Sequence, residues 1–297
     1  MNKIIYLSLL FFVIIAILLI FWFIHLSSDL EYFTQNPRQT SITIKSDNNS
    51  VLATYGDIYS GHVDISEISK HLLNAVVSIE DHRFYNHFGV DFRGIARAIY
   101  VNLSEGHVVQ GGSTITQQLA KIMFLNSEKS FLRKIRELLI TLKLEESLQK
   151  EEILSLYLNR AYFGFGNYGV ASASKNYFSK SPKELNFYEA AILAATLKAP
   201  SRLNPIISIE ANRKRAKLVM KKMLDFGYIS PKDYEDSVDK INQIVVSKKF
   251  NIHDRYFTDW IYRRSSSYEK NSSDIVINTT FNTKIQKYIE KAVLKIL

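Results

Sequence analysis

The stretch Glu80-Asp81-His82-Arg83-Phe84-Tyr85-Asn86-His87-Phe88-Gly89 follows an apolar run whose spacing predicts a helix over 71–79 that packs into a core. Glu80 and Asp81 therefore stand at the end of a helix, where the negative pole of the helix dipole disfavours a carboxylate. Burial there would favour the protonated form of one of them. The pair is either a general-base site or, as for most charged residues, a solvated helix end.

The composition is that of a globular protein with an excess of positive charge. The chain has 297 residues, a formal net charge of +9 and no cysteine. This charge suits an anionic partner, but the basic residues are not interleaved with aromatic residues and glycines as in RNA-binding proteins, so we expect no nucleic acid partner. The lack of cysteine excludes thiolate metal sites, cysteine nucleophiles and disulfides.

An apolar stretch within residues 4–26 has the length needed to cross a bilayer core as a helix. It follows Lys3 and precedes acidic residues, so the positive-inside rule predicts a cytoplasmic tail at 1–3 and an external remainder. A cleavable signal peptide is the alternative, but its apolar region would be shorter and would end in a small-x-small site, whereas Phe21-Trp22-Phe23 closes this one. We expect an uncleaved, single-pass anchor.

Two short strands at 41–45 and 51–55 predict a β-hairpin, after which helical patterns dominate. Asp91 is predicted to cap the helix that follows the opening stretch. A later helix over 131–148 is expected to place Phe131 and Leu138, among other residues, in the core. Further helices are expected at 150–158, 188–197, 211–226 and 285–297, with a strand at 275–280.

The turn Gly111-Gly112 leads into a helix that we expect Ser113 to cap. Polar residues share one face of this helix at i, i+4 and i+7: Thr114, Gln118 and Lys121. An apolar stripe about 100° away consists of Ile115, Leu119 and Ile122. Such a helix can present polar groups to a ligand while its apolar stripe anchors it, although a solvated surface helix has the same pattern.

Two other patterns carry less information. Arg133 and Glu137 stand four residues apart on a predicted helix, which is typical of a surface ion pair worth a few tenths of a kcal/mol. The glycines of 164–169 spell GxGxxG, but a helix rather than a strand precedes them and no βαβ unit surrounds them. We therefore reject a dinucleotide site.

Taken together, these stretches resemble the peptidoglycan glycosyltransferase domain (glycosyltransferase family 51) of class A penicillin-binding proteins and monofunctional transglycosylases. Five blocks match in order: 80–89, 111–121, Arg133-Lys134-x-x-Glu137, Lys150-x-x-Ile153-Leu154-x-x-Tyr157-Leu158-Asn159, and 190–205. The resemblance implies a mainly α, lysozyme-like two-lobed domain at 40–240, behind a single N-terminal transmembrane helix and with a small β element near the membrane. It also implies the bacterial inner membrane, with the catalytic domain outside.

In that family, a growing glycan on undecaprenyl pyrophosphate is transferred to lipid II with inversion, and undecaprenyl pyrophosphate leaves. The resemblance implies that Glu80 is the general base and that Glu137 is a second essential carboxylate, which organises the pyrophosphate or a divalent cation (Mg²⁺ or Mn²⁺). The implied substrate-binding residues are Asp81, Phe84, His87, Ser113, Thr114, Gln117, Gln118, Lys121, Arg133, Lys134 and Lys198. Implied partners are the membrane and other cell-wall synthesis proteins.

The chain departs from the family pattern at two places. Ile122 stands where the family usually has Asn. Residues 241–297 resemble a linker and the start of a transpeptidase domain whose serine-x-x-lysine, Ser-x-Asn and Lys-Thr-Gly motifs are not present as a set, so we expect no transpeptidase activity. The alternatives to a transferase are a truncated, non-catalytic scaffold and, ranked lower, a lysozyme-like hydrolase.

Overall fold

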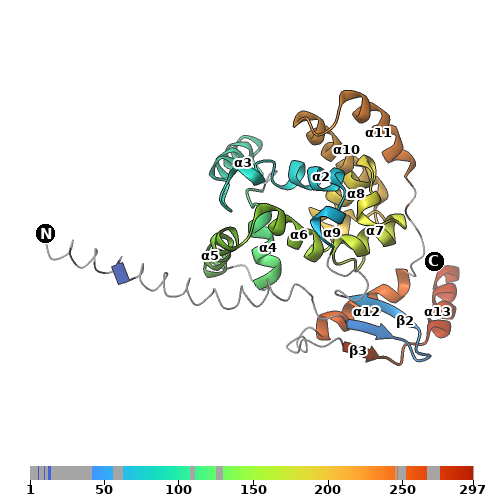
Figure 1. The fold of residues 1–297 in the computed structure, drawn as a ribbon. Coiled ribbons are helices and arrows are strands. Elements are labelled where there is room, and N and C mark those ends of the chain that lie inside the picture. Colours follow the sequence, from blue (N-terminus) through green and yellow to red (C-terminus); the bar gives the residue numbers. More distant parts are fainter. Residues whose placement is uncertain are drawn as a thin grey trace. The chain divides into compact units, whose positions relative to one another are not determined.

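The computed structural model describes residues 42–55, 63–107, 111–124, 130–244, 252–265 and 275–296, together with Tyr6, Leu10, Val13, Ile14 and Val246. The described chain is mainly helical with one small sheet, which confirms the predicted mainly α class with a small β element (Figure 1). It divides into two compact units, as expected of a two-lobed domain. We call residues 83–154 unit 1, and residues 38–82 with 155–297 unit 2.

The anchor predicted over 4–26 lies, apart from four residues, outside the described residues. In the part of the chain that the structure describes, no helix has the length and apolar character needed to cross a membrane. The anchor and its orientation stay predictions.

Unit 1 is built around two helices that pack on each other, α4 (Ile115–Phe124) and α5 (Phe131–Ser147). Their contact buries Ile115 and Leu119 of α4 with Ile140 and Leu144 of α5. The unit also contains the 3-10 turn η2 (Phe84–Asn86), α3 (Phe92–Glu105) and the first turn of α6 (Lys150–Arg160). Asp91 stands at the start of α3 as predicted, but its side chain makes no capping hydrogen bond.

The predicted core positions of α5 are partly wrong. Phe131 is 80% exposed and Leu138 is 39% exposed. The buried stripe of the helix is instead Glu137, Ile140, Thr141, Leu144 and Glu145. Two glutamates, Glu137 and Glu145, belong to this buried stripe. A prediction that assigns only apolar residues to the core therefore selects the wrong face of the helix. Ile122 is also exposed, at 41%, and does not share the burial of Ile115 and Leu119.

The helical part of unit 2 is centred on α8 (Phe187–Leu197), whose residues 190–196 are all buried. α2 (Lys70–Glu80) and α10 (Ile209–Asp225) pack against α8 and against each other. The unit also includes the second half of α6 and these shorter elements: η1 (Ile65–Glu67), α7 (Val170–Phe178), η3 (Pro182–Glu184), α9 (Pro200–Leu203) and α11 (Pro231–Gln243). This packing fixes the C-terminal end of α2, where Glu80 lies.

The sheet of unit 2 has the strand order β2-β1-β3. β1 (Ile42–Lys45) and β2 (Val51–Tyr55) are antiparallel and form the predicted hairpin, while β3 (Ile275–Asn278) runs parallel to β1. α12 (Ile252–Ser265) packs against β2, and α13 (Thr283–Ile296) follows β3. The strand that the sequence predicts near 275 thus completes the sheet of unit 2, whereas a domain boundary at 240 stays a prediction.

The glycine-rich loop at 161–169 has a structural use. Gly164 has a φ of +79°, and a Cβ there would lie 2.2 Å from the carbonyl oxygen of Pro200. The buried Tyr177 hydroxyl donates to the carbonyls of Phe163 and Gly164 at 2.8 and 2.9 Å. Gly164 therefore permits a tight backbone path that a residue with a Cβ could not follow.

Candidate active site

Glu80 is the last residue of α2 in unit 2, and Asp81 is the residue that ends the helix. The Glu80 side chain is 13% exposed, and its Oε1 lies 3.9 Å from Nη2 of Arg215, whose side chain is 16% exposed. Asp81 is buried at 7% exposure, and its backbone N–H donates to the Val77 carbonyl. The two adjacent carboxylates thus sit at the negative end of a helix and mostly out of water, with a guanidinium beside the first of them.

Two neighbours of Glu80 show the effect of this partly dry environment. Burial raises the pKa of Tyr157 well above its usual value, and the negative charge of Glu80 adds to the effect. Burial lowers the pKa of Arg215, while the charge of Glu80 acts in the opposite direction. The phenol is therefore neutral at physiological pH, and Arg215 carries the positive charge, because a guanidinium stays protonated in proteins.

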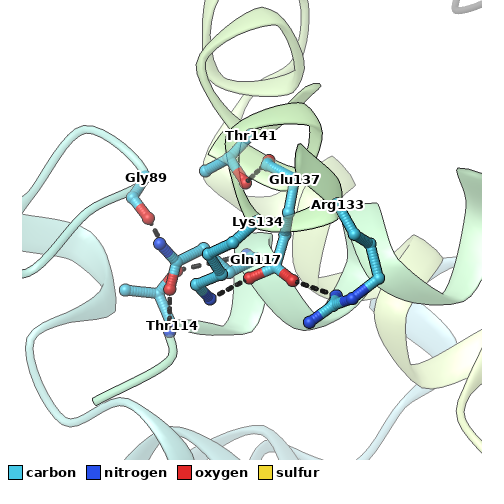
Figure 2. A network of polar contacts seen from close by, with 7 residues as sticks. All are labelled: Gly89, Thr114, Gln117, Arg133, Lys134, Glu137 and Thr141. Atoms are coloured by element: carbon cyan, nitrogen blue, oxygen red, sulfur yellow. Dashed lines mark hydrogen bonds and ion pairs between the residues drawn. The ribbon is translucent and has the colours of Figure 1, made fainter. Parts of the chain in front are cut away.

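Glu137 is the centre of a charged cluster in unit 1 (Figure 2). Its side chain is 4% exposed; Arg133 Nη1 donates to one carboxylate oxygen at 2.8 Å and Lys134 Nζ donates to the other. The Lys134 side chain is half exposed and the Arg133 side chain is 21% exposed. Both cations are thus partly accessible at the surface, while the carboxylate that they bind is buried. The sequence predicted an ion pair on the helix surface. This prediction is wrong for Glu137, because its carboxylate is buried in the interior.

The side chains of Thr114 and Gln117 make hydrogen bonds within unit 1 (Figure 2). The Thr114 hydroxyl accepts the N–H of Gln117 at 3.2 Å, and the Gln117 side-chain oxygen accepts the N–H of Thr114 at 3.1 Å. This reciprocal pair is a capping box, so Thr114 caps α4 and the predicted cap Ser113, which is exposed, is wrong. The Thr114 hydroxyl also donates to the Gly89 carbonyl at 2.6 Å, which binds α4 to the end of the opening stretch.

The other candidate residues fall into two groups. Phe84 is fully buried, with Nζ of Lys150 4.6 Å from its ring centroid, and His87 lies edge-on to it at 6.4 Å between ring centroids. Gln118 is half-buried on α4. The exposed members of the set are Ser113 and Lys121 in unit 1 and Lys198, which follows α8, in unit 2. Within each unit the structure therefore brings together only some of the candidates.

Sequence reasoning missed one charged residue in each unit: Arg215 in unit 2 and Glu145 in unit 1. Arg215 lies in a helix with many basic residues, and nothing in its spacing singles it out. Glu145 is buried in unit 1, where its carboxylate accepts the Thr116 hydroxyl at 2.5 Å and Lys150 Nζ at 2.7 Å. Glu145 lies on the same helical stripe as Ile140 and Leu144, and this position could have indicated that its side chain is buried.

The described residues do not fit a divalent cation held by the protein alone. Among them, no group of three or more histidine or acidic side chains could hold a metal ion. Both oxygens of Glu137, the one residue for which the resemblance implied metal binding, already accept from Arg133 and Lys134. The donors here are cations, which neutralise the carboxylate that a metal ion would need.

Comparison with known proteins places the chain in a family. Residues 48–224 match the family model described as Transglycosylase. The chain is 42% identical over 236 residues to penicillin-binding protein 1A of Aquifex aeolicus (strain VF5), which covers 78% of this chain and 32% of the relative. It is 38% identical over 278 residues to penicillin-binding protein 1A of Haemophilus influenzae, over 91% of this chain and 31% of the relative. The chain therefore belongs to the transglycosylase family.

A crystal structure of penicillin-binding protein 1A from Haemophilus influenzae aligns with a TM-score of 0.46 and 24% identity, over 86% of this chain and 29% of that chain. In each of these comparisons the chain spans less than a third of the length of the protein it matches.

Replacing Thr114 by Ala removes the hydroxyl that caps α4 and bonds to Gly89. We expect the free energy of unfolding, measured by denaturant titration, to fall by about 1–2 kcal/mol. Ser113→Ala removes a hydroxyl from the adjacent, exposed position and serves as the matched control, with an expected change below about 0.5 kcal/mol. Equal losses for the two variants would contradict the assignment of Thr114 as the cap.

Proposed function

We propose that this chain is a peptidoglycan glycosyltransferase that polymerises lipid II into glycan strands and releases undecaprenyl pyrophosphate. The observation that carries the proposal is the Arg133–Lys134–Glu137 cluster, which offers two surface-reaching cations within the segment that matches the transglycosylase family. The family match favours neither a non-catalytic scaffold nor a hydrolase.

The reaction requires a base for the acceptor hydroxyl. The acceptor oxygen attacks the anomeric carbon of the donor, the new C–O bond forms, and the bond from that carbon to the diphosphate breaks on the opposite face, which inverts the configuration. The hydroxyl proton passes to the Glu80 carboxylate. A mostly buried carboxylate kept ionised by a nearby guanidinium is suited to accept it.

The leaving group requires positive charge. Arg133 and Lys134 together carry two positive charges against the single negative charge of Glu137, so the cluster has a net charge of +1 that attracts the diphosphate. A guanidinium can hold phosphate oxygens in a bidentate manner, and Lys adds a point charge. We assign Gln118 and Lys121 to the same substrate, since both present polar groups from α4. A divalent cation, Mg²⁺ or Mn²⁺, would arrive bound to the diphosphate and would add further positive charge to it.

The substrate's lipid tail requires access to a membrane, and unit 1 has a surface suited to one. α3 and the residue four positions before it expose large apolar side chains by 55–78%: Phe88, Phe92, Ile99, Tyr100 and Leu103. Arg93 and Arg97 are exposed on the same helix. Apolar side chains combined with arginines are typical of helices that lie in the interface of an anionic bilayer. We therefore propose that α3 contacts the membrane.

Glu80→Gln removes the proposed base while it keeps the size of the side chain. We expect glycan polymerisation from labelled lipid II in detergent, with divalent cation present, to slow by about 100-fold or more. The matched control is Glu151→Gln, which makes the same change at an exposed position of α6 and should keep wild-type turnover. Full activity of a folded Glu80→Gln variant would exclude Glu80 as the base.

The membrane contact of α3 can be tested with a single reporter, since the chain has no cysteine. Leu103→Cys labelled with the fluorophore NBD should shift its emission to the blue in anionic vesicles and be quenched by a lipid-borne quencher. Leu218→Cys, labelled in the same way at an exposed apolar position on α10, is the control, and its NBD emission should stay that of a fluorophore in water. An NBD group at 103 that stays in water in the presence of vesicles would refute the contact.

A further inference from the structure

We infer that Arg215 is a positioning residue that acts through Glu80: the guanidinium of Arg215 keeps the Glu80 carboxylate ionised at the end of α2. The inference rests on the proposed function in which Glu80 takes the acceptor proton, but its physical content, the coupling of the two charges, can be measured without activity. Arg215 lies outside the five sequence blocks that carry the family resemblance.

The geometry couples Arg215 to Glu80 within one unit. α10 packs against α2 through its buried face, which includes Ala216 and Val219, and this packing brings Arg215 to the C-terminal end of α2. The distance of 3.9 Å between Nη2 and Oε1 is too long for a hydrogen bond but short for a Coulomb interaction between two mostly buried side chains. Arg215 can therefore stabilise the anion without fixing its oxygen in a hydrogen bond.

The end of α2 requires a cation on physical grounds. The helix dipole places partial negative charge there, and Glu80 and the buried Asp81 add two adjacent carboxyl groups. A mostly buried carboxyl group in such a place favours its protonated form unless a positive charge is near. A protonated Glu80 could not act as a base, so the cation from α10 has a direct use in the reaction.

Two other ionisable side chains near this end of α2 are Tyr157 and His82. Tyr157 of α6 is a neutral phenol, because burial raises its pKa. His82, two residues beyond Glu80, stacks on Phe226 at 5.0 Å between ring centroids. Arg215 is the cation from α10 that the described structure pairs with Glu80.

Arg215 also differs from the other basic residues of α10. Arg213 is held by Glu210 and by the Ile244 carbonyl, and Lys221 and Lys222 pair with Asp225. In contrast, the ion partner of Arg215 lies on another helix, since Glu80 belongs to α2. Nε of Arg215, like that of Arg213, is buried with no hydrogen-bond partner among the described residues, and such a donor costs free energy.

The test measures the titration of Glu80 by NMR in the full chain labelled with ¹³C at glutamate carboxyl carbons, with the Glu80 signal assigned by its loss in Glu80→Gln. In Arg215→Gln we expect the midpoint to move up by about one pH unit, since an opposite charge at this distance favours the carboxylate. Arg215→Lys, whose shorter ammonium group keeps the charge, should move it by a smaller amount. Lys214→Gln, an exposed position on the same helix, is the control and should leave it unchanged.

An unchanged midpoint in Arg215→Gln, or an equal shift in Lys214→Gln, would overturn the inference. If Arg215→Gln does not fold, Arg215→Met, which removes the charge and keeps a long unbranched side chain, decides, and a wild-type midpoint in that variant refutes the coupling. In an active enzyme the acid limb of kcat/KM against pH should shift in the same order as the midpoint; a loss of rate that is equal at every pH would indicate a purely structural role. A shifted midpoint in a chain that forms no glycan would support the coupling and contradict only the proposed function.

Discussion

The structure depends on one constraint: a carboxylate removed from water must lie beside a positive charge. In the part of the chain that the structure describes, four glutamate side chains are 13% exposed or less and have a cation beside them. In unit 1, Glu137 pairs with Arg133 and Lys134, and Glu145 pairs with Lys150. In unit 2, Glu189 pairs with Lys180 and Glu80 lies beside Arg215. Since an unpaired buried charge is strongly destabilising, these pairs limit which helices can pack together.

The separation of the charges distinguishes the pairs that hold the fold from those suited to chemistry. Glu145 accepts from Lys150 and Thr116 at hydrogen-bond distance, and Lys150 also lies over the Phe84 ring, so this pair connects α4, α5, α6 and η2. The pair of Glu80 is longer, at 3.9 Å, which stabilises an anion that must still accept a proton. At Glu137 the cations extend to the surface and can meet an anionic ligand.

Local patterns in the sequence predicted most of the fold but only part of the site. The hairpin, α2, α8 and the basic helix α10 follow from periodicity and turn residues, which are local properties. The cap of α4 was assigned to Ser113 instead of Thr114 because adjacent hydroxyls satisfy the same local rule, and the bond from Thr114 to Gly89 is a long-range contact. Arg215 could not be identified because its partner is 135 residues away in the chain and on another helix. Charge pairing across helices has no sequence period.

The central claim is that the chain transfers glycosyl groups between lipid-linked substrates. The most direct measurement counts two products from lipid II in the same reaction: the undecaprenyl pyrophosphate released and the new reducing ends formed. Glycosyl transfer predicts undecaprenyl pyrophosphate release in equal amount to the glycosidic bonds formed, with no rise in reducing ends. Release of undecaprenyl pyrophosphate with an equal number of new reducing ends would indicate that water is the acceptor, as in a hydrolase, and the absence of both products from a folded wild-type chain would indicate a non-catalytic protein; either result would contradict the account.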